Sequence, residues 1–302
     1  MTAVLYPATV FIWGTTWLAI AYQIGDVPIA NSIMYRFAIA ALILVSVLAL
    51  SGRLQKFNPQ QHLSCLLLGL CLFSCNFMLF YHAAQYIPSG LISIVFSIAT
   101  IMNMLNSWLF HGQRPSLRLL CGGCLGIGGI IMLFYPDLSQ AEHFSEQILG
   151  LLMALAGTYC FSLGNILSAK QQQQGLSVLS VNAYGMAYGA LLLLLWSLVS
   201  GQGFSFSLQA LYLGSLFYLA IIGSVLGFSF YLVLVGRLGP QKAAYATVLF
   251  PIVALALSTI FEGYQWSNLG LLGVVTVLLG NLLVFTKGRP SLAWLRRPRQ
   301  AV

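Results

Sequence analysis

Long apolar runs separated by short polar breaks make up most of this 302-residue chain. A hydrocarbon core about 30 Å thick is crossed by roughly 20 apolar residues in a helix, and the runs have about that length. Apolar and polar positions do not alternate within them as they would in the strands of a membrane barrel. The pattern predicts an all-α integral membrane protein with ten membrane-spanning helices. We expect these helices at residues 3–24, 30–51, 62–85, 89–110, 117–135, 147–169, 178–200, 208–235, 241–261 and 267–286.

The composition excludes a water-soluble protein. Hydrophobic residues make up 59% of the chain and charged residues only 6%, against roughly 25% charged residues in soluble domains. Most of the exterior must therefore face lipid. The formal net charge of +8 does not indicate a nucleic-acid partner, because the basic residues are divided among the short connections between spans.

The positions of the charges predict an orientation. If the N-terminus is cytoplasmic, twelve of the thirteen Lys and Arg residues fall in cytoplasmic connections or in the C-terminal tail, and all five acids fall on the other side. An excess of basic residues marks the cytoplasmic side of membrane proteins. We therefore predict a multi-pass protein of the bacterial inner membrane, with both termini cytoplasmic and a basic tail at residues 289–302.

The two halves of the sequence are similar to each other. A shift of 151 residues places Gly122 over Gly273 and Gly129 over Gly280. Because each half holds an odd number of spans, the second half must cross the membrane in the opposite sense to the first. This inverted arrangement is used by many secondary transporters. The two five-helix repeats are expected at residues 1–137 and 147–288.

Five short motifs occur in order along the chain. They are Trp13-Gly14-Thr15-Thr16-Trp17, Tyr35-Arg36-Phe37, Ile87-Pro88-Ser89-Gly90, Leu249-Phe250-Pro251 and Phe261-Glu262-Gly263. Together they resemble the EamA-type branch of the drug/metabolite transporter superfamily, and the resemblance covers essentially the whole chain. It implies a ten-helix carrier that exports amino acids, their derivatives or analogues. It also implies a central cavity enclosed by the first, third, fourth, sixth, eighth and ninth helices.

The chain departs from this family pattern in its first half. Thr100 and His111 stand where the family often has Pro and Glu, whereas the second half keeps Pro251 and Glu262. Pro251 removes a backbone hydrogen bond in mid-span. Arg36 is the one basic residue outside the connections. The resemblance implies structural or gating roles for Arg36, Pro251 and Glu262.

Polar side chains inside the spans must face protein or a water-filled cavity, because they are costly in hydrocarbon. In the fourth span Ser97, Thr100 and Asn103 share one helical face. Substrate contact and hydrogen bonding between helices remain equal alternatives for them, as do cavity wall and packing for the two Trp residues. Because histidine side chains can take part in proton transfer, His82 is either a structural group or a proton carrier. The cavity candidates are Trp13, Trp17, Asn76, His82, Ser97, Thr100, Asn103, Tyr159, Ser162, Asn165, Tyr231 and Tyr245.

These observations favour a secondary transporter that exports a small amphipathic metabolite by alternating access. The alternative is a membrane-embedded enzyme acting on a lipid or small metabolite, which needs a nucleophile beside a base. Cys75 and His82 are about 10 Å apart along one helix, too far for direct proton transfer.

We expect no catalytic residue, metal or cofactor. We expect a monomer, with a homodimer as the alternative. Because no acid lies near the membrane midplane, we expect a neutral or zwitterionic substrate and no obvious ion coupling.

Overall fold

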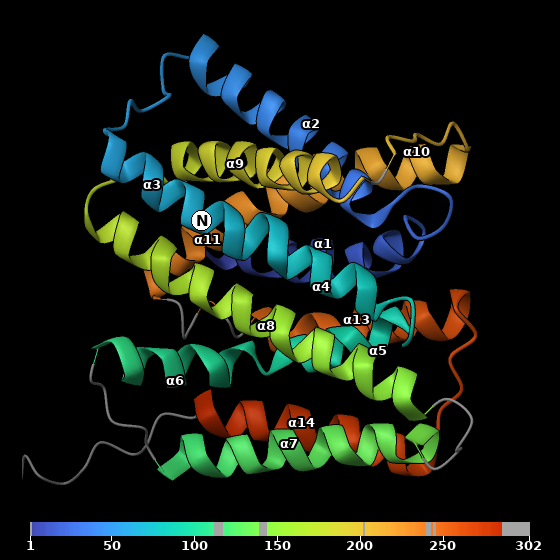
Figure 1. Ribbon diagram of the computed structural model, residues 1–302. Coiled ribbons are helices and arrows are strands. Elements are labelled where there is room, and N and C mark those ends of the chain that lie inside the picture. The colour runs from blue at the N-terminus through green and yellow to red at the C-terminus, as the bar shows by residue number, and fades with distance from the viewer. Residues whose placement is uncertain are drawn as a thin grey trace, which may run out of the picture.

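All regular structure in the described part of the chain is helical. The computed structural model describes residues 2–111, 117–138, 144–201, 203–239, 243 and 246–285, and the helices run side by side as one bundle (Figure 1). The elements of the first half are α1 (Thr2–Ala21), α2 (Ile29–Leu50), α3 (Pro59–Leu68), η1 (Gly69–Cys75), α4 (Asn76–Ala83), α5 (Ser89–Ser97), α6 (Ala99–His111) and α7 (Leu117–Leu138). Those of the second half are α8 (Phe144–Gln173), α9 (Val178–Val199), α10 (Ala210–Phe217), η2 (Tyr218–Leu226), α11 (Gly227–Leu238), α13 (Ala246–Phe261) and α14 (Asn268–Phe285).

The lengths and compositions of these helices fit a membrane protein. Seven helical stretches of the described residues are long and apolar enough to cross a bilayer, and three shorter ones are also apolar. The seven are Val4–Ala21, Ile29–Leu50, Pro59–Ala83, Ser89–Phe110, Phe144–Gln173, Val178–Val199 and Ala210–Leu238. The shorter three are Leu120–Tyr135, Ala246–Phe261 and Asn268–Leu283. The predicted all-α membrane class is confirmed.

Three of the predicted spans are not continuous α-helices. The third and eighth spans contain the π-helical segments η1 and η2, and the fourth is broken at Ile98, between α5 and α6. π-helical turns are rare and often occur at functional sites. At the start of η1, a Cβ on Gly69 would lie only 2.6 Å from the carbonyl oxygen of Gly185 in α9. This close backbone contact is invisible in the sequence.

Glycines join α7 to α14, which lie side by side (Figure 1). A Cβ on Gly129 would lie 2.6 Å from the carbonyl oxygen of Gly273, and one on Gly280 would lie 2.7 Å from that of Gly122. The residue number rises along one helix as it falls along the other, so the two helices are antiparallel. The Gly122-x-x-x-Gly126 motif thus packs within the chain, because only glycine lets backbones approach so closely.

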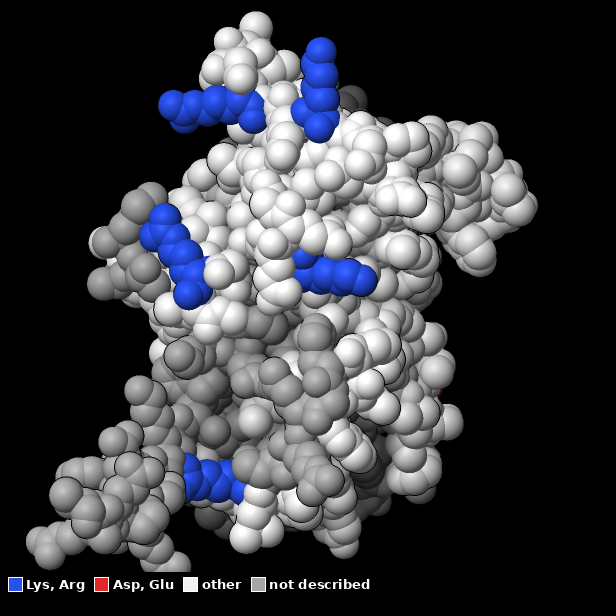
Figure 2. All heavy atoms as spheres, turned by 90° about the vertical axis from the view of Figure 1, so that its left-hand side faces the viewer, with Lys and Arg blue, Asp and Glu red and all other residues white. Residues whose placement is uncertain are grey.

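Basic side chains gather at one end of the bundle, which faces the viewer in Figure 2. Arg53 and Lys56 follow α2, while Lys170 and Arg237 stand in the last turns of α8 and α11. Three acids whose side chains are described lie at the opposite end of the bundle (Figure 1). They are Asp26 between α1 and α2, Glu146 in the first turn of α8 and Glu262 after α13.

Candidate functional site

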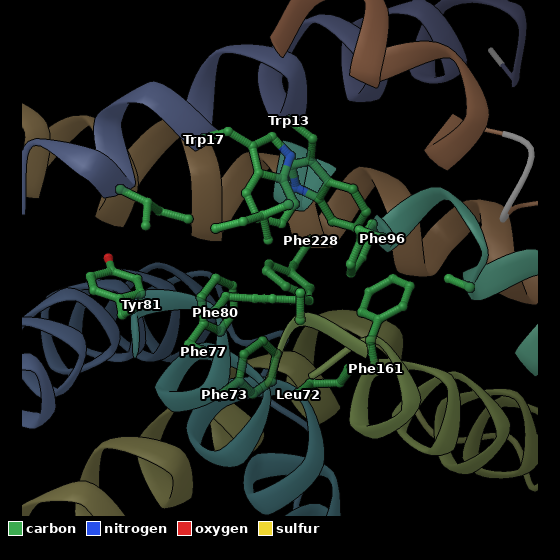
Figure 3. Packing of buried hydrophobic residues seen from close by; sticks show 14 of the residues in the cluster. Trp13, Trp17, Leu72, Phe73, Phe77, Phe80, Tyr81, Phe96, Phe161 and Phe228 are labelled. Atoms are coloured by element: carbon green, nitrogen blue, oxygen red, sulfur yellow. The ribbon is translucent and has the colours of Figure 1, made fainter. Parts of the chain in front are cut away.

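A small cavity lies near the middle of the bundle, where helices of both halves meet. Its wall is mostly aromatic, and Figure 3 shows Trp13 and Trp17 facing phenylalanines from other helices. The lining residues are Trp13, Thr16, Trp17 and Ile20 of α1, Arg36 of α2, Asn76, Phe77 and Phe80 of α4, Phe96 of α5, Phe161 of α8, Phe228 of α11 and Phe250 of α13. The volume is about 30 Å³, room for one or two water molecules.

Trp13 stands at the centre of the aromatic cluster. Its ring centroid lies 4.6 Å from that of Tyr231, 5.1 Å from Phe228 and 5.9 Å from Phe161. Trp17, one turn along α1, is stacked on Phe250 at 6.0 Å. These separations are typical of favourable aromatic pairs. Trp13 and Trp17 are four residues apart and therefore share one face of α1. That face is turned to the cavity.

Glycines of the eighth span allow α1 to approach closely. A Cβ on Gly227 would lie 2.7 Å from Nε1 of Trp13, and one on Gly223 would lie 2.8 Å from Cγ2 of Thr16. The Gly223-x-x-x-Gly227 motif thus allows the face of α1 that carries Trp13 to pack closely against η2 and α11. This packing within the chain is what holds Trp13 among its aromatic neighbours.

Arg36 and Asn76 are the strongest polar groups of the cavity wall. Arg36 is 2% exposed, and its Nε donates a hydrogen bond of 2.9 Å to the Ser224 hydroxyl of η2. Asn76 is 1% exposed, and its Nδ2 donates to the Gly157 carbonyl of α8 at 2.9 Å. The cavity wall therefore includes the one basic residue that lies outside the connections.

A second polar group lies beside the aromatic cluster, toward the basic end of the bundle. Asn165 of α8 donates from Nδ2 to the Tyr231 hydroxyl at 3.0 Å and, more weakly, to Asn103 Oδ1 at 3.4 Å. Asn106 donates to the Ser162 hydroxyl at 2.8 Å. All five residues are fully buried. None of these residues lines the described cavity. The predicted candidates Asn103, Asn165 and Tyr231 are joined to one another, and the candidate Ser162 is joined to Asn106.

The polar face of the fourth span is turned toward protein. The Ser97 hydroxyl donates to the Ile94 carbonyl at 2.6 Å and accepts from Asn281 Nδ2 of α14 at 3.1 Å. Thr100 is fully buried. Neither residue lines the described cavity. For Ser97, hydrogen bonding between helices is the alternative that the structure supports.

Two further candidates, His82 and Tyr159, are not found at the cavity. His82 is half-buried in the last turn of α4, where its Nδ1 lies 3.2 Å from Gln85 Oε1. Tyr159 is 42% exposed, because it stands one position away from the buried face of α8. Tyr245 lies outside the described residues. Pro251 lies inside α13 and is buried beside the cavity residue Phe250.

Glu262 connects the two halves at the acidic end of the bundle. Its carboxylate accepts hydrogen bonds from the hydroxyl (2.6 Å) and the backbone N–H (3.3 Å) of Ser89, the first residue of α5. A negative charge at a helix N-terminus is stabilising. Glu262, which belongs to one of the motifs that resemble the family, thus contacts Ser89 of the other half of the chain.

We predict that Glu262→Gln weakens this contact. Loss of the charge should lower the free energy of unfolding by about 1 kcal/mol, measured by thermal melting in detergent micelles. Asp26→Asn is the matched control, because the Asp26 carboxylate is exposed and accepts one long hydrogen bond, of 3.5 Å, from Gln209. Equal melting temperatures for the two variants would contradict the prediction.

The phenylalanines of the cavity wall are the site residues that sequence reasoning missed. Phe77, Phe80, Phe96, Phe161 and Phe228 all stand within apolar runs. A phenylalanine inside such a run suits lipid and protein interior equally well. The residue type therefore does not show whether the side chain faces the bilayer or the inside of the protein. A helical-face argument starting from Trp13 and Asn76 was the one available signal.

Comparison with known proteins identifies the family. The EamA-like transporter family matches the chain twice, over residues 2–135 and 148–286. The chain belongs to this family. This EamA-type protein is therefore a membrane transporter of the drug/metabolite type and not an enzyme.

Its relatives extend over nearly the whole chain. Protein PagO of Salmonella typhimurium is 24% identical, covering 93% of this chain and 91% of that protein. The inner membrane transporter YedA of Escherichia coli K12 is 26% identical, with coverages of 91% and 90%. A Salmonella typhimurium protein named "Probable amino-acid metabolite efflux pump" is 25% identical, with 90% of each chain covered. One solved crystal structure shares the fold, with a TM-score of 0.67 at 17% identity over 94% of this chain and 96% of the other.

Proposed function

We propose that this EamA-type protein exports a small amphipathic metabolite, such as an amino acid or a derivative, by alternating access through the central cavity. The observation that carries the proposal is the composition of the cavity wall. Its aromatic residues come from α1, α4 and α5 of the first half and from α8, α11 and α13 of the second. A wall shared equally by two halves can open to either side when the halves move relative to each other.

Ten crossings in two inverted repeats, at residues 1–137 and 147–288, are part of this proposal. The two segments that match the family lie within these bounds. The π-helical segments η1 and η2 begin at Gly69 and Tyr218, 149 residues apart. Phe77 and Phe228, 151 residues apart, both line the cavity, with ring centroids 6.0 Å from each other. The antiparallel packing of α7 on α14 is a further sign of inverted symmetry.

The cavity in this conformation is contracted. A volume of about 30 Å³ is far below the roughly 300 Å³ at the lower end for ligand pockets. Binding of a metabolite therefore requires the helices around the cavity to separate. The π-helical segments and the break at Ile98 give the third, eighth and fourth spans places to bend, since such irregularities are recognised sites of helix bending. Trp13, Trp17 and Asn76 are the residues we propose to contact the solute.

We infer that the basic end of the bundle is cytoplasmic, with both termini on that side in an inner membrane. The placement of Arg53, Lys56, Lys170 and Arg237 at one end supports this orientation through the excess of positive charge inside. In this orientation Glu262 and Ser89 close the outer end, where their contact would act as a gate. The Asn103–Asn165–Tyr231 group would lie between the cavity and the cytoplasm.

Orientation can be tested by cysteine labelling in intact cells. In a variant without the six native cysteines, Asp26→Cys should react with a membrane-impermeant maleimide, and Arg53→Cys should react only after the cells are broken. Both positions lie in connections that flank α2, so they differ mainly in the side of the membrane. The reverse labelling pattern would refute the orientation and the inverted-repeat assignment built on it.

Counterflow in proteoliposomes tests the function itself. Vesicles loaded with a mixture of unlabelled amino acids and aromatic acids should take up at least one labelled member of that mixture faster than protein-free vesicles do. A membrane transporter of this proposed substrate class must exchange such a solute. If no member of a panel covering neutral, anionic and cationic metabolites is exchanged by the folded protein, the proposed function is wrong.

A further inference from the structure

Arg36 is a charge buried in the membrane-spanning bundle with an unused hydrogen-bond donor. It stands seven residues into α2, or about 10 Å from the start of that helix, and is 2% exposed. Its Nε is bonded to Ser224, but its Nη1 is buried without a hydrogen-bond partner. Arg36 lines the central cavity. A guanidinium has five N–H donors and no acceptor, so what it lacks is an acceptor group.

The surroundings of Arg36 do not supply a negative charge. Its guanidinium carbon lies 4.3 Å from the ring centroid of Phe77 and 5.0 Å from that of Phe37. These ring faces stabilise a cation only in part. Among the described side chains, the titratable group with which Arg36 interacts electrostatically is the phenol of Tyr81. A buried cation without a counter-ion is costly, and the described groups around Arg36 recover that cost only in part.

Tyr81 lies beside the Arg36 guanidinium. Its side chain is fully buried, and the two groups interact electrostatically and through a side-chain hydrogen bond. Neither Arg36 Nη1 nor the Tyr81 hydroxyl has a hydrogen-bond partner of good geometry, so the pair does not satisfy all of its donors. Buried polar groups in native structures are nearly always paired. Arg36, which lines the cavity, has a donor left over, and this indicates a ligand that provides the acceptor.

We propose that Arg36, positioned by Tyr81 beside it, binds the carboxylate of the transported solute, and that the aromatic wall binds a flat apolar body attached to that carboxylate. This inference rests on the proposed function and specifies its substrate class as aromatic carboxylates. A carboxylate has two oxygens, which can accept hydrogen bonds from N–H groups of the guanidinium. One fixed positive charge matches a single negative charge, whereas a phosphate dianion would be left half-neutralised. The rings of Trp17, Phe80 and Phe96 provide the apolar surface.

Matched probe ligands can test this assignment in purified protein. Binding of 3-phenylpropanoate, 3-phenylpropanamide and phenethylamine should be compared in wild type, Arg36→Gln, Arg36→Lys and Tyr81→Phe. The three probes share one ring and a similar chain and differ in the charge of the head group. We expect wild type to prefer the carboxylate to the amide by at least about tenfold in Kd, which is about 1.4 kcal/mol.

The variants should change carboxylate binding selectively. Arg36→Gln should raise the Kd of 3-phenylpropanoate at least about tenfold and leave the Kd of 3-phenylpropanamide within about twofold, since a hydrogen bond to a charged group is worth more than a neutral one. Arg36→Lys should show a smaller loss, because lysine keeps the charge but not the planar fork. It also reports on the site if Arg36→Gln does not fold. Tyr81→Phe should weaken carboxylate binding by a few fold. Arg53→Gln, outside the bundle interior, is the control.

The inference is overturned if wild type binds the amide or the amine as well as the carboxylate, or binds none of the three. Equal losses for carboxylate and amide in Arg36→Gln would assign Arg36 a structural role instead. Counterflow separates these outcomes from failure of the proposed function. Exchange of a neutral or cationic metabolite that is unaffected by Arg36→Lys would leave the transporter assignment standing and remove the carboxylate site.

Discussion

Trp13→Ala is expected to reduce the initial rate of solute exchange at least about tenfold per folded molecule, a loss of about 1.4 kcal/mol in transition-state or binding free energy. Trp13 is 6% exposed and has ring contacts with aromatic residues of α5, α8, α11 and α13. Its removal would take away the central surface of the cavity wall. It would also lower stability, since Trp→Ala in a core costs roughly 3–5 kcal/mol, so rates must be normalised to folded protein.

Two other tryptophan variants separate a site effect from loss of bulk. Trp13→Phe keeps an aromatic ring in the cluster and should retain most of the exchange rate. Trp196→Ala removes a tryptophan that is 55% exposed on α9, and its rate should equal that of wild type. Counterflow in proteoliposomes gives the rates, and size-exclusion chromatography gives the folded fraction. A Trp13→Ala protein as active as Trp196→Ala would exclude the cavity as the solute path.

Gly129→Ala should produce the largest loss of stability among single-methyl changes in α7. The added Cβ would lie 2.6 Å from the Gly273 carbonyl oxygen and 2.7 Å from the Val277 backbone nitrogen. Backbone atoms cannot move aside as a flexible side chain can, so α7 and α14 must separate. Overpacking of this kind typically costs about 1–3 kcal/mol, and the cost here should lie at the upper end. Thermal melting of the purified protein measures it.

The preceding residue gives a closely matched control. A Cβ on Gly128 would meet no atom within 4 Å, and the residue has the same helical backbone. Gly128→Ala should therefore melt at or slightly above the wild-type temperature, because alanine favours helix over glycine by about 1 kcal/mol. Similar melting temperatures for the two variants would show that α7 and α14 do not pack as closely as the structure indicates.

The sequence predicts the elements well because the bilayer imposes a simple rule on them. A helix that crosses hydrocarbon needs about 20 apolar residues, and each observed helical stretch overlaps a predicted span. Interruptions such as η1 do not follow from that rule. They depend on contacts such as that between Gly69 and α9, which join residues more than 100 positions apart.

The site was predicted only in part, and the reason differs between residue types. Trp13, Trp17 and Asn76 were singled out because large amphipathic or polar groups inside an apolar run need a protein or cavity environment. Ser97 met the same criterion, yet it is bonded to Ile94 and Asn281. A polar side chain in a span can satisfy its hydrogen bonds in either place, and sequence spacing does not distinguish the two.

The amino-acid sequence alone determined that this protein is a helical membrane protein, where its apolar runs lie and which family its motifs resemble, because these properties follow from local composition and order. Only the tertiary structure decided which residues meet at the centre. It placed phenylalanines of five helices around Trp13 and Trp17, and left Arg36 beside them with an unpaired donor. Such groupings depend on how distant helices pack and rotate against one another, which a pattern read along one chain does not contain.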